Sequence, residues 1–140
     1  MDQITRLNKW ANAHTNIPID IVRVVFGGFL FYKGLFFVKS ASYLVEIAQP
    51  FGIDGLSYFT IQTVPMFHIV GGVLIAIGLL TRLTAAIHVP LLAGALVVNL
   101  IGNLDMSNLL QASVALLLCC FFLFYGSGKH SLDYRMKLNQ

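Results

Sequence analysis

Apolar residues are concentrated in four long stretches of the chain, which are separated by short polar segments. Each stretch is about as long as the 20 or so residues that an α-helix needs to cross the hydrocarbon core of a bilayer. A pattern of this kind predicts an all-α integral membrane protein, a four-helix transmembrane bundle. The expected spans are about 19–38, 62–80, 83–101 and 109–126.

Composition supports a membrane location. Of the 140 residues, 57% are hydrophobic and only 11% are charged. A soluble domain of this composition would expose large apolar patches, whereas lipid matches such a surface. The connecting segments are too short to hold a second folded unit. We therefore expect residues 1–140 to form a single transmembrane domain.

Two segments outside the spans carry helical patterns. In Met1–Pro18, apolar residues recur at helical spacing beside Arg6 and Lys9, which predicts a short amphipathic N-terminal helix in the membrane interface; a solvated tail is the alternative. Between the first two spans, Tyr43–Val45 predicts another short amphipathic helix, followed by a turn at Pro50–Gly55. Both segments suit the boundary between membrane and water.

The basic residues are distributed unequally between the two sides of the membrane. Six of the nine fall on the side that holds both termini: Arg6, Lys9, Arg82, Lys129, Arg135 and Lys137. The positive-inside rule places that side in the cytoplasm, which for a bacterial protein means the inner membrane. The net charge of +3 is thereby explained by topology, so we expect no nucleic-acid partner.

Glycines recur at positions where helices can pack closely. In the second span they follow a stripe that also includes His68 and Ile75, and the connector to the third span is short enough to make the two helices antiparallel neighbours. Small residues allow close helix contact in membranes. The glycines that we expect at helix contacts are Gly27, Gly71, Gly72 and Gly78, with Gly28 and Gly94 in the same role.

Three motifs together resemble the DoxX family of small four-helix membrane proteins. They are Arg23-Val-Val-Phe-Gly27 with Lys33-Gly34-Leu35-Phe36-Phe37, the run from Gly71-Gly72 to Gly78-Leu-Leu-Thr81-Arg82, and the tail Gly126-Ser-Gly128-Lys-His-Ser131-Leu132-Asp133. The resemblance implies the fold. It also implies a place among subunits like those of thiosulfate:quinone oxidoreductase, or among partners in membrane-bound thiol and quinone redox assemblies.

Polar side chains in the outer halves of the spans form the first candidate site. Counted along the helices, Lys33, His68 and Asn99 lie roughly 21, 20 and 25 Å from the cytoplasmic side. Such groups usually face the bundle interior. Lysine and histidine donors there would suit the carbonyls of a quinone, or a lipid headgroup. The alternative is that Lys33 extends to the outer interface while His68 and Asn99 bond to nearby backbone.

A second polar set lies at the cytoplasmic ends of the spans. Asp20 and Arg23 are three residues apart and are expected to pair on one helix. Arg23, Arg82 and Asp133 could form a docking surface for an acidic partner or lipid headgroups. Ordinary anchoring at the interface is the alternative reading.

Histidine and cysteine spacing does not indicate a metal or haem site. Counted from the turn between the second and third spans, His68 and His88 should differ by about 10 Å in depth, so they could not ligate one haem. Cys119 and Cys120 are adjacent on one helix and point about 100° apart, which disfavours a disulfide between them. We expect no intrinsic cofactor and buried, unpaired thiols.

Two functional hypotheses remain. The first is an accessory subunit of a membrane oxidoreductase complex that interacts with a quinone or lipid. The second is a non-catalytic scaffold or assembly subunit that binds other membrane subunits or a second copy of itself through glycine-rich faces. Catalysis by the chain alone is the weaker reading, because the sequence lacks a nucleophile–base pair, a C-x-x-C pair and a phosphate-binding loop.

Overall fold

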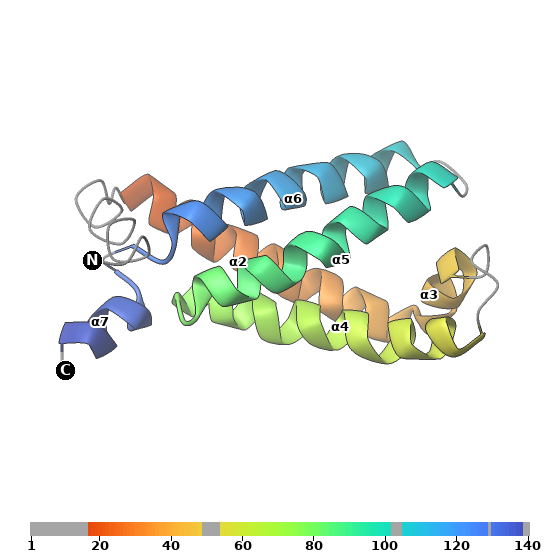
Figure 1. The fold of residues 1–140 in the computed structure, drawn as a ribbon, viewed down its shortest axis with the longest axis horizontal. Coiled ribbons are helices and arrows are strands. Elements are labelled where there is room, and N and C mark those ends of the chain that lie inside the picture. Colours follow the sequence, from red (N-terminus) through yellow and green to blue (C-terminus); the bar gives the residue numbers. More distant parts are fainter. Residues whose placement is uncertain (1–16, 49–53, 102–104, 129, 139–140) are drawn as a thin grey trace.

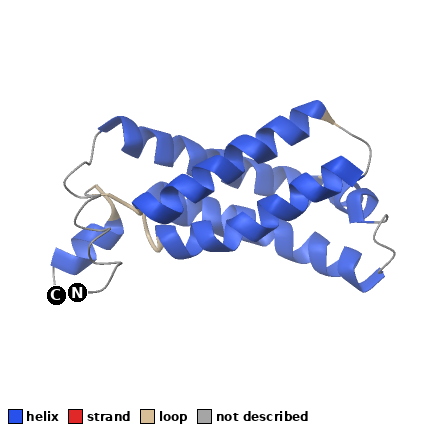
Figure 2. Ribbon diagram, turned by 45° about the horizontal axis from the view of Figure 1, so that its top comes forward, coloured by secondary structure: helices blue, strands red, loops and turns tan. Residues whose placement is uncertain are grey.

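The computed structural model describes residues 17–48, 54–101, 105–128 and 130–138. These residues form helices with short connections and contain no strand (Figures 1 and 2). Four of the helices are long and apolar enough to cross a membrane. The prediction of an all-α four-helix membrane bundle is confirmed. The helices are α2 Ile17–Lys39, α3 Ala41–Ala48, α4 Asp54–Ile77, α5 Thr81–Ile101, α6 Met106–Tyr125 and α7 Leu132–Leu138.

Helix α4 differs from the expected second span at both ends: it begins at Asp54, eight residues before the expected start at residue 62, and it ends before Leu80. The second span, expected to reach Leu80, ends at Ile77 because Gly78 adopts a positive φ of 73°. The amide of Gly78 donates to the carbonyl of Ile75, and that of Leu79 donates to Leu74. This is the Schellman pattern, in which glycine ends the helix and the last carbonyls gain partners. Gly78 therefore lies in a turn and not within a helix.

The helices form two antiparallel pairs, α2 with α4 and α5 with α6 (Figures 1 and 2). Helix α5 also contacts α4. One end of the bundle holds the start of α2, the α4–α5 turn and α7, and is called the α7 end below; the opposite end, with α3, is called the α3 end. Residues 1–16 of the predicted N-terminal amphipathic segment and the first part of the predicted turn at Pro50–Gly55 lie outside the described residues. The rest of the turn prediction is wrong, because Asp54 and Gly55 belong to α4.

Glycines bring α2 and α4 into backbone contact. A Cβ atom at Gly27 would lie 2.5 Å from the Gly72 carbonyl oxygen, and one at Gly72 would lie 2.5 Å from the amide nitrogen of Phe31. Gly28, by contrast, has open space where its Cβ would be, and so does Gly94 on α5. Only part of the glycine pattern therefore serves packing within the chain.

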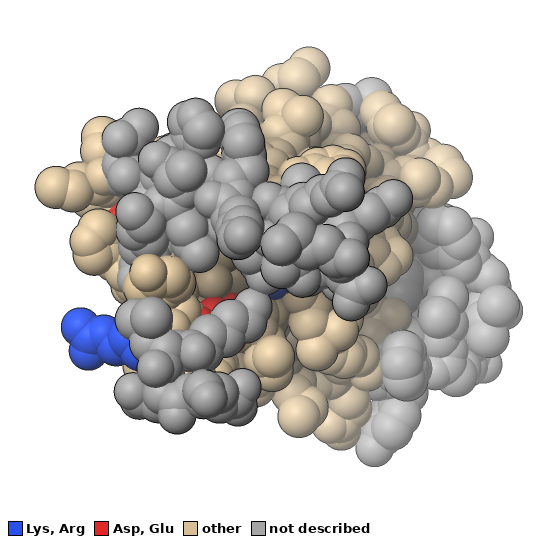
Figure 3. Space-filling view, turned by 60° about the vertical axis from the view of Figure 1, so that its left-hand side comes forward, with Lys and Arg blue, Asp and Glu red and all other residues tan. Residues whose placement is uncertain are grey.

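The core is a small apolar cluster around which most large side chains point outward. Phe26 and Phe122 are buried and stack with ring centroids 6.2 Å apart, which joins α2 to α6. Many large apolar side chains are exposed, among them Val25 and Leu117. Figure 3 shows the α7 end, where described basic and acidic side chains appear as blue and red areas; the exposed apolar side chains make up most of the remaining described surface in this view. Such a surface matches a hydrocarbon solvent.

Helix α3 packs over the bundle at the end that bears its name. Leu44 is fully buried, and Tyr43 stacks on Phe37 of α2. The Tyr43 hydroxyl accepts a hydrogen bond of 2.9 Å from the side-chain amide of Asn108 on α6. Burial raises the pKa of Tyr43, and the negative charge of Asp105 adds to this shift, so the phenol is neutral at pH 7. The predicted short helix at Tyr43–Val45 is confirmed.

Candidate functional site

The side chains of His68 and His88 meet in the middle of the bundle. Their ring centroids are 5.4 Å apart, at an interplanar angle of 66°. The prediction that they differ by about 10 Å in depth is wrong. Because α4 ends at Ile77 and α5 begins at Thr81, the two residues lie only about 14 and about 10 Å from their helix ends.

Hydrogen bonds fix both imidazole rings in the same way. Nδ1 of His68 lies 2.8 Å from the carbonyl oxygen of Val64, and Nδ1 of His88 lies 2.8 Å from that of Thr84. A carbonyl only accepts, so Nδ1 carries the proton in each ring. In the neutral state each Nε2 therefore presents a lone pair. This pair of rings, His68 with His88, is the candidate site.

Nε2 of His88 is buried without a hydrogen-bond partner among the described residues. His88 has no exposed surface, and its Nε2 makes no hydrogen bond within the described residues, although the backbone of Phe67 lies near the ring. His68 is 6% exposed. An unpaired acceptor in hydrocarbon costs free energy, which a hydrogen-bond donor would recover. The pair is thus suited to accept a hydrogen bond or a proton.

Two neighbours define the surroundings of the histidine pair. A Cβ atom at Gly71 would lie 2.1 Å from Cε1 of His88, so only glycine lets the ring lie against α4. The ring of Phe37 meets His68 edge-on, with centroids 5.4 Å apart. The sequence predicted a helix contact at Gly71. It did not predict that His88 is the group that lies against Gly71, or that Phe37 meets His68, because the expected depth of His88 was different.

Lys33 and Asn99, the other members of the predicted outer layer, lie differently. Lys33 is half-buried, with its ammonium 5.6 Å from the centre of the Phe36 ring. Asn99 lies about 16 Å further along α5 than His88, and its buried Oδ1 has no partner within the described residues. The structure thus places Asn99 away from the pair.

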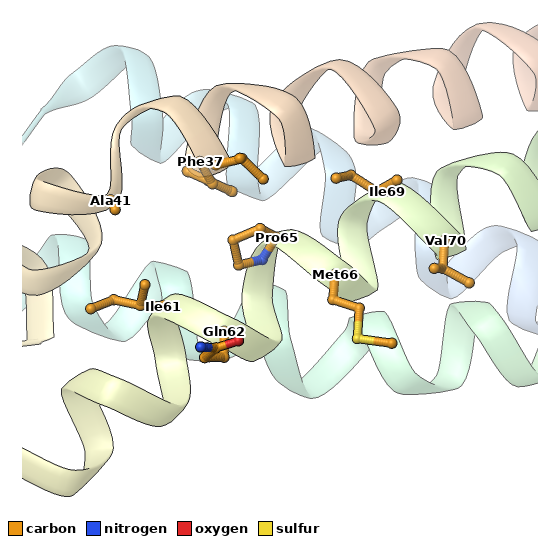
Figure 4. Close-up of a pocket in the computed structure, with 9 residues that line it drawn as sticks. Phe37, Ala41, Ile61, Gln62, Pro65, Met66, Ile69 and Val70 are labelled. Carbon is orange, nitrogen blue, oxygen red and sulfur yellow. The ribbon is translucent and has the colours of Figure 1, made fainter.

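A groove of about 430 Å³ opens on the outer surface of α2 and α4 near the α3 end (Figure 4). Its lining is apolar except for Gln62, and Phe37 belongs to it. Pro65 has no amide hydrogen, so the carbonyl of Ile61 loses its helical partner beside the groove. Phe37 is the residue that both lines the groove and contacts His68.

At the α7 end, the predicted ion pair between Asp20 and Arg23 is confirmed. Nη1 of Arg23 lies 3.0 Å from the carboxylate of Asp20 and also donates to the carbonyl of Ser127. The other carboxylate oxygen lies 2.6 Å from Nδ1 of His130. Arg23 is only 3% exposed, so its guanidinium bonds within the chain, to Asp20 and the C-terminal segment, and is not available at the surface.

Arg82 and Asp133 also bond within the chain. Nη2 of Arg82 donates to the carbonyl of Phe124 over 3.1 Å, and a carboxylate oxygen of Asp133 accepts from the amide of Leu80 over 3.0 Å. Both residues are half-buried. They hold the C-terminal segment against the α4–α5 turn, and their role in docking stays a prediction.

The prediction of two buried thiols is correct for Cys119 and wrong for Cys120. Cys119 is buried and Cys120 is half-buried, and both thiols are free. Within the described ranges, no three His, Cys, Asp or Glu side chains gather to hold a metal ion. The two histidine rings touch each other, and a haem does not fit between rings in contact.

Comparison with known proteins identifies the class of this membrane bundle. The sequence model of the DoxX family matches residues 19–100, which cover α2 to nearly the end of α5. The chain belongs to the DoxX family. No curated protein and no solved structure matches it.

Proposed function

We propose that this protein is an accessory subunit of a membrane oxidoreductase complex and binds a hydroquinone at the histidine pair. The observation that supports this proposal is the contact between two buried histidines whose Nδ1 atoms are both engaged with backbone carbonyls. Each Nε2 is then an acceptor. Intramembrane ionisable residues generally mark ligand or proton sites.

The tautomer favours the reduced form of a quinone. A quinone ring carries carbonyl oxygens, which only accept, whereas a hydroquinone carries hydroxyl groups, which donate. A hydroquinone hydroxyl could donate a hydrogen bond to Nε2 of His68. His68 would then act as an acceptor, whereas a donor was expected from the sequence. The reaction on this ring would be proton acceptance, while the electrons need a partner's flavin, haem or disulfide.

The groove supplies a route for an apolar tail. A quinone used in membranes has a polar ring and a long hydrocarbon tail, and the groove is an apolar depression open to lipid. Phe37 separates its inner wall from His68. We place the tail in the groove and the ring beside Phe37, where rotation of this half-buried side chain would admit it.

We also place the α7 end in the cytoplasm of a bacterium, in the inner membrane. The support is the basic residues of the short segments at that end, such as Arg82 and Arg135.

Thermal unfolding with a bound hydroquinone tests the proposed function. With a decyl-substituted benzohydroquinone at about 100 times its Kd, the wild-type protein in mild detergent should gain roughly 2.7 kcal/mol of stability. The matching oxidised quinone should stabilise less. His68→Leu should abolish the gain and leave the unliganded melting temperature similar, because the hydrogen bond that it removes is made to Val64 within the same helix and a net hydrogen bond contributes only about 1 kcal/mol.

His130→Leu is the matched control, since this exposed histidine lies outside the pair. It should respond to hydroquinone as the wild-type protein does. A gain that survives in His68→Leu, or that phospholipid produces equally well in both proteins, would rule out hydroquinone binding at the pair.

A scaffold role is the second candidate, and the exposed face of α5 favours it. Gly94 and Ala95 are exposed, and a Cβ at Gly94 meets nothing within 4 Å, so a helix of another subunit could approach closely there. Gly72 and Gly78, by contrast, contact this chain itself. If the protein is a scaffold, Gly94→Leu should remove co-purifying subunits, while Gly28→Leu, at an equally open position, should not.

A further inference from the structure

Buried polar residues occupy only part of the bundle. Among the described residues, those that are buried and polar or charged lie between the histidine pair and the α7 end; they are Arg23, His68, Thr81, Thr84, His88 and Ser131. The described core residues toward the α3 end, such as Leu44 and Leu92, are apolar. The buried polar residues of the described chain therefore lie from the histidine pair toward the α7 end, among buried apolar residues such as Ile75 and Phe122.

Three of these residues form one face of α5. Thr81, Thr84 and His88 are spaced by three and four residues, so they lie one above another on the helix. The backbone of Thr84 is bonded to the His88 ring. Thr81 has no exposed surface, and its hydroxyl oxygen makes no hydrogen bond within the described part of the chain.

Two fully buried polar groups on this face thus have no hydrogen-bond partner among the residues that the structure describes, the Thr81 hydroxyl and Nε2 of His88. Leaving a polar atom unpaired in the interior is destabilising, because the atom loses its hydrogen bonds to water and gains none in return. Buried water commonly satisfies such atoms when several polar groups adjoin. The neighbouring side chains Thr84 and His68 provide the additional polar groups.

The polar face of α5 ends at a carboxylate. Asp133 accepts from the amide of Leu80, which directly precedes Thr81, and its own amide donates to the carbonyl of Gly78 over 3.2 Å. Asp133 is half-buried at the α7 end. The series of ionisable and hydroxyl groups runs from His68 through His88, Thr84 and Thr81 to Asp133.

We propose that this face of α5 is a proton path between the histidine pair and the α7 end. Side chains three residues apart on a helix are separated by about 5–6 Å at Cβ, a gap that one water molecule spans. Water bound between Thr84 and Thr81 would link the hydroxyl groups into one hydrogen-bonded series.

Proton transfer along this path changes no group permanently. His68 accepts a proton on Nε2 and becomes an imidazolium, then transfers that proton to Nε2 of His88 and returns to the neutral form. His88 releases the proton from Nε2 to water beside Thr84 and becomes neutral again, because its Nδ1 proton stays bonded to the Thr84 carbonyl. Each hydroxyl group or water molecule accepts one proton while it donates another. Asp133 takes the last proton and releases it to bulk water. The path rests on the arrangement of α5 and does not require that the proton comes from a hydroquinone.

Cysteine accessibility tests whether water enters this face. In a background of Cys119→Ala and Cys120→Ala, Thr84→Cys should react with the water-soluble reagent 2-aminoethyl methanethiosulfonate roughly ten times faster than Ala85→Cys, because the reagent attacks thiolates in water. Ala85 is the matched control, since it is adjacent and fully buried. Adding Thr81→Val should slow labelling of Thr84→Cys toward the rate of Ala85→Cys.

Hydrogen exchange in the wild-type protein is a second test of the path. It does not depend on whether a substituted protein folds. The ring N–H of His88 should exchange with water faster than backbone amides of the same turns, measured by nitrogen-15 NMR in lipid nanodiscs. Equal labelling of Thr84→Cys and Ala85→Cys, or a His88 ring proton as protected as the neighbouring amides, would overturn the path. Neither result depends on ligand binding, so the proposed function can fail while the path stands.

Discussion

Replacing Asp20 with asparagine is expected to lower the free energy of unfolding by about 3–5 kcal/mol. The substitution preserves size but removes the negative charge beside Arg23, which is 3% exposed. The guanidinium stays charged in proteins, so it would remain in the interior without a counter-ion. The Ser127 carbonyl, which also accepts from Arg23, offers only a dipole in compensation.

A double-mutant cycle measures this ion pair directly. Asp20→Asn, Arg23→Met and the double variant are unfolded in a reversible detergent titration. The double variant should be less destabilised than the sum of the single changes, because it removes both charges together. Arg135→Met, at an exposed position, is the control and should change stability little. A loss below about 1 kcal/mol for Asp20→Asn would contradict the importance of this contact.

The second large effect is expected at Gly27, with its neighbour Gly28 as the control. Gly27→Ala is expected to destabilise the bundle by about 1–3 kcal/mol, because the new methyl group would lie within 2.6 Å of backbone atoms of Gly72 and Ala76. Backbone cannot move aside as a flexible side chain can. Helices α2 and α4 would have to separate along their contact.

Gly28→Ala is the matched control, one residue away on the same helix. Nothing lies within 4 Å of its added methyl group, and alanine favours a helix over glycine by up to about 1 kcal/mol. We expect unchanged or slightly higher stability in the same detergent titration. Equal effects of the two substitutions would show that α2 does not meet α4 through Gly27.

The membrane class and the helices could be predicted from the sequence because lipid imposes a length and a composition on each span. Family membership could be predicted as well, since its motifs cover most of the chain. The limits of the α4–α5 turn could not, because only the positive φ of Gly78 decides that α4 ends at Ile77. A three-residue difference at that point changed the depth assigned to His68.

The prediction of the candidate site depended on where the second span ends. With the turn counted as helix, His68 and His88 were separated in depth and His68 was grouped with Asn99. The signal that could have paired them is the distance of each histidine from its own helix end. The i, i+3 spacing of Asp20 and Arg23 was sufficient to predict their local pair, whereas the contact with Ser127 joins residues 104 positions apart and has no local pattern.

Nitrogen-15 NMR of the histidine rings tests the central claim, that the pair presents two Nε2 acceptors to a hydroquinone. The spectra of wild-type protein, His68→Leu and His88→Leu assign the signals. We predict that both rings carry their proton on Nδ1 at neutral pH, and that a decyl-substituted benzohydroquinone shifts the Nε2 signal of His68 while leaving that of His130 unchanged. Protonation on Nε2 in both rings, or Nε2 signals that hydroquinone does not move, would contradict this account.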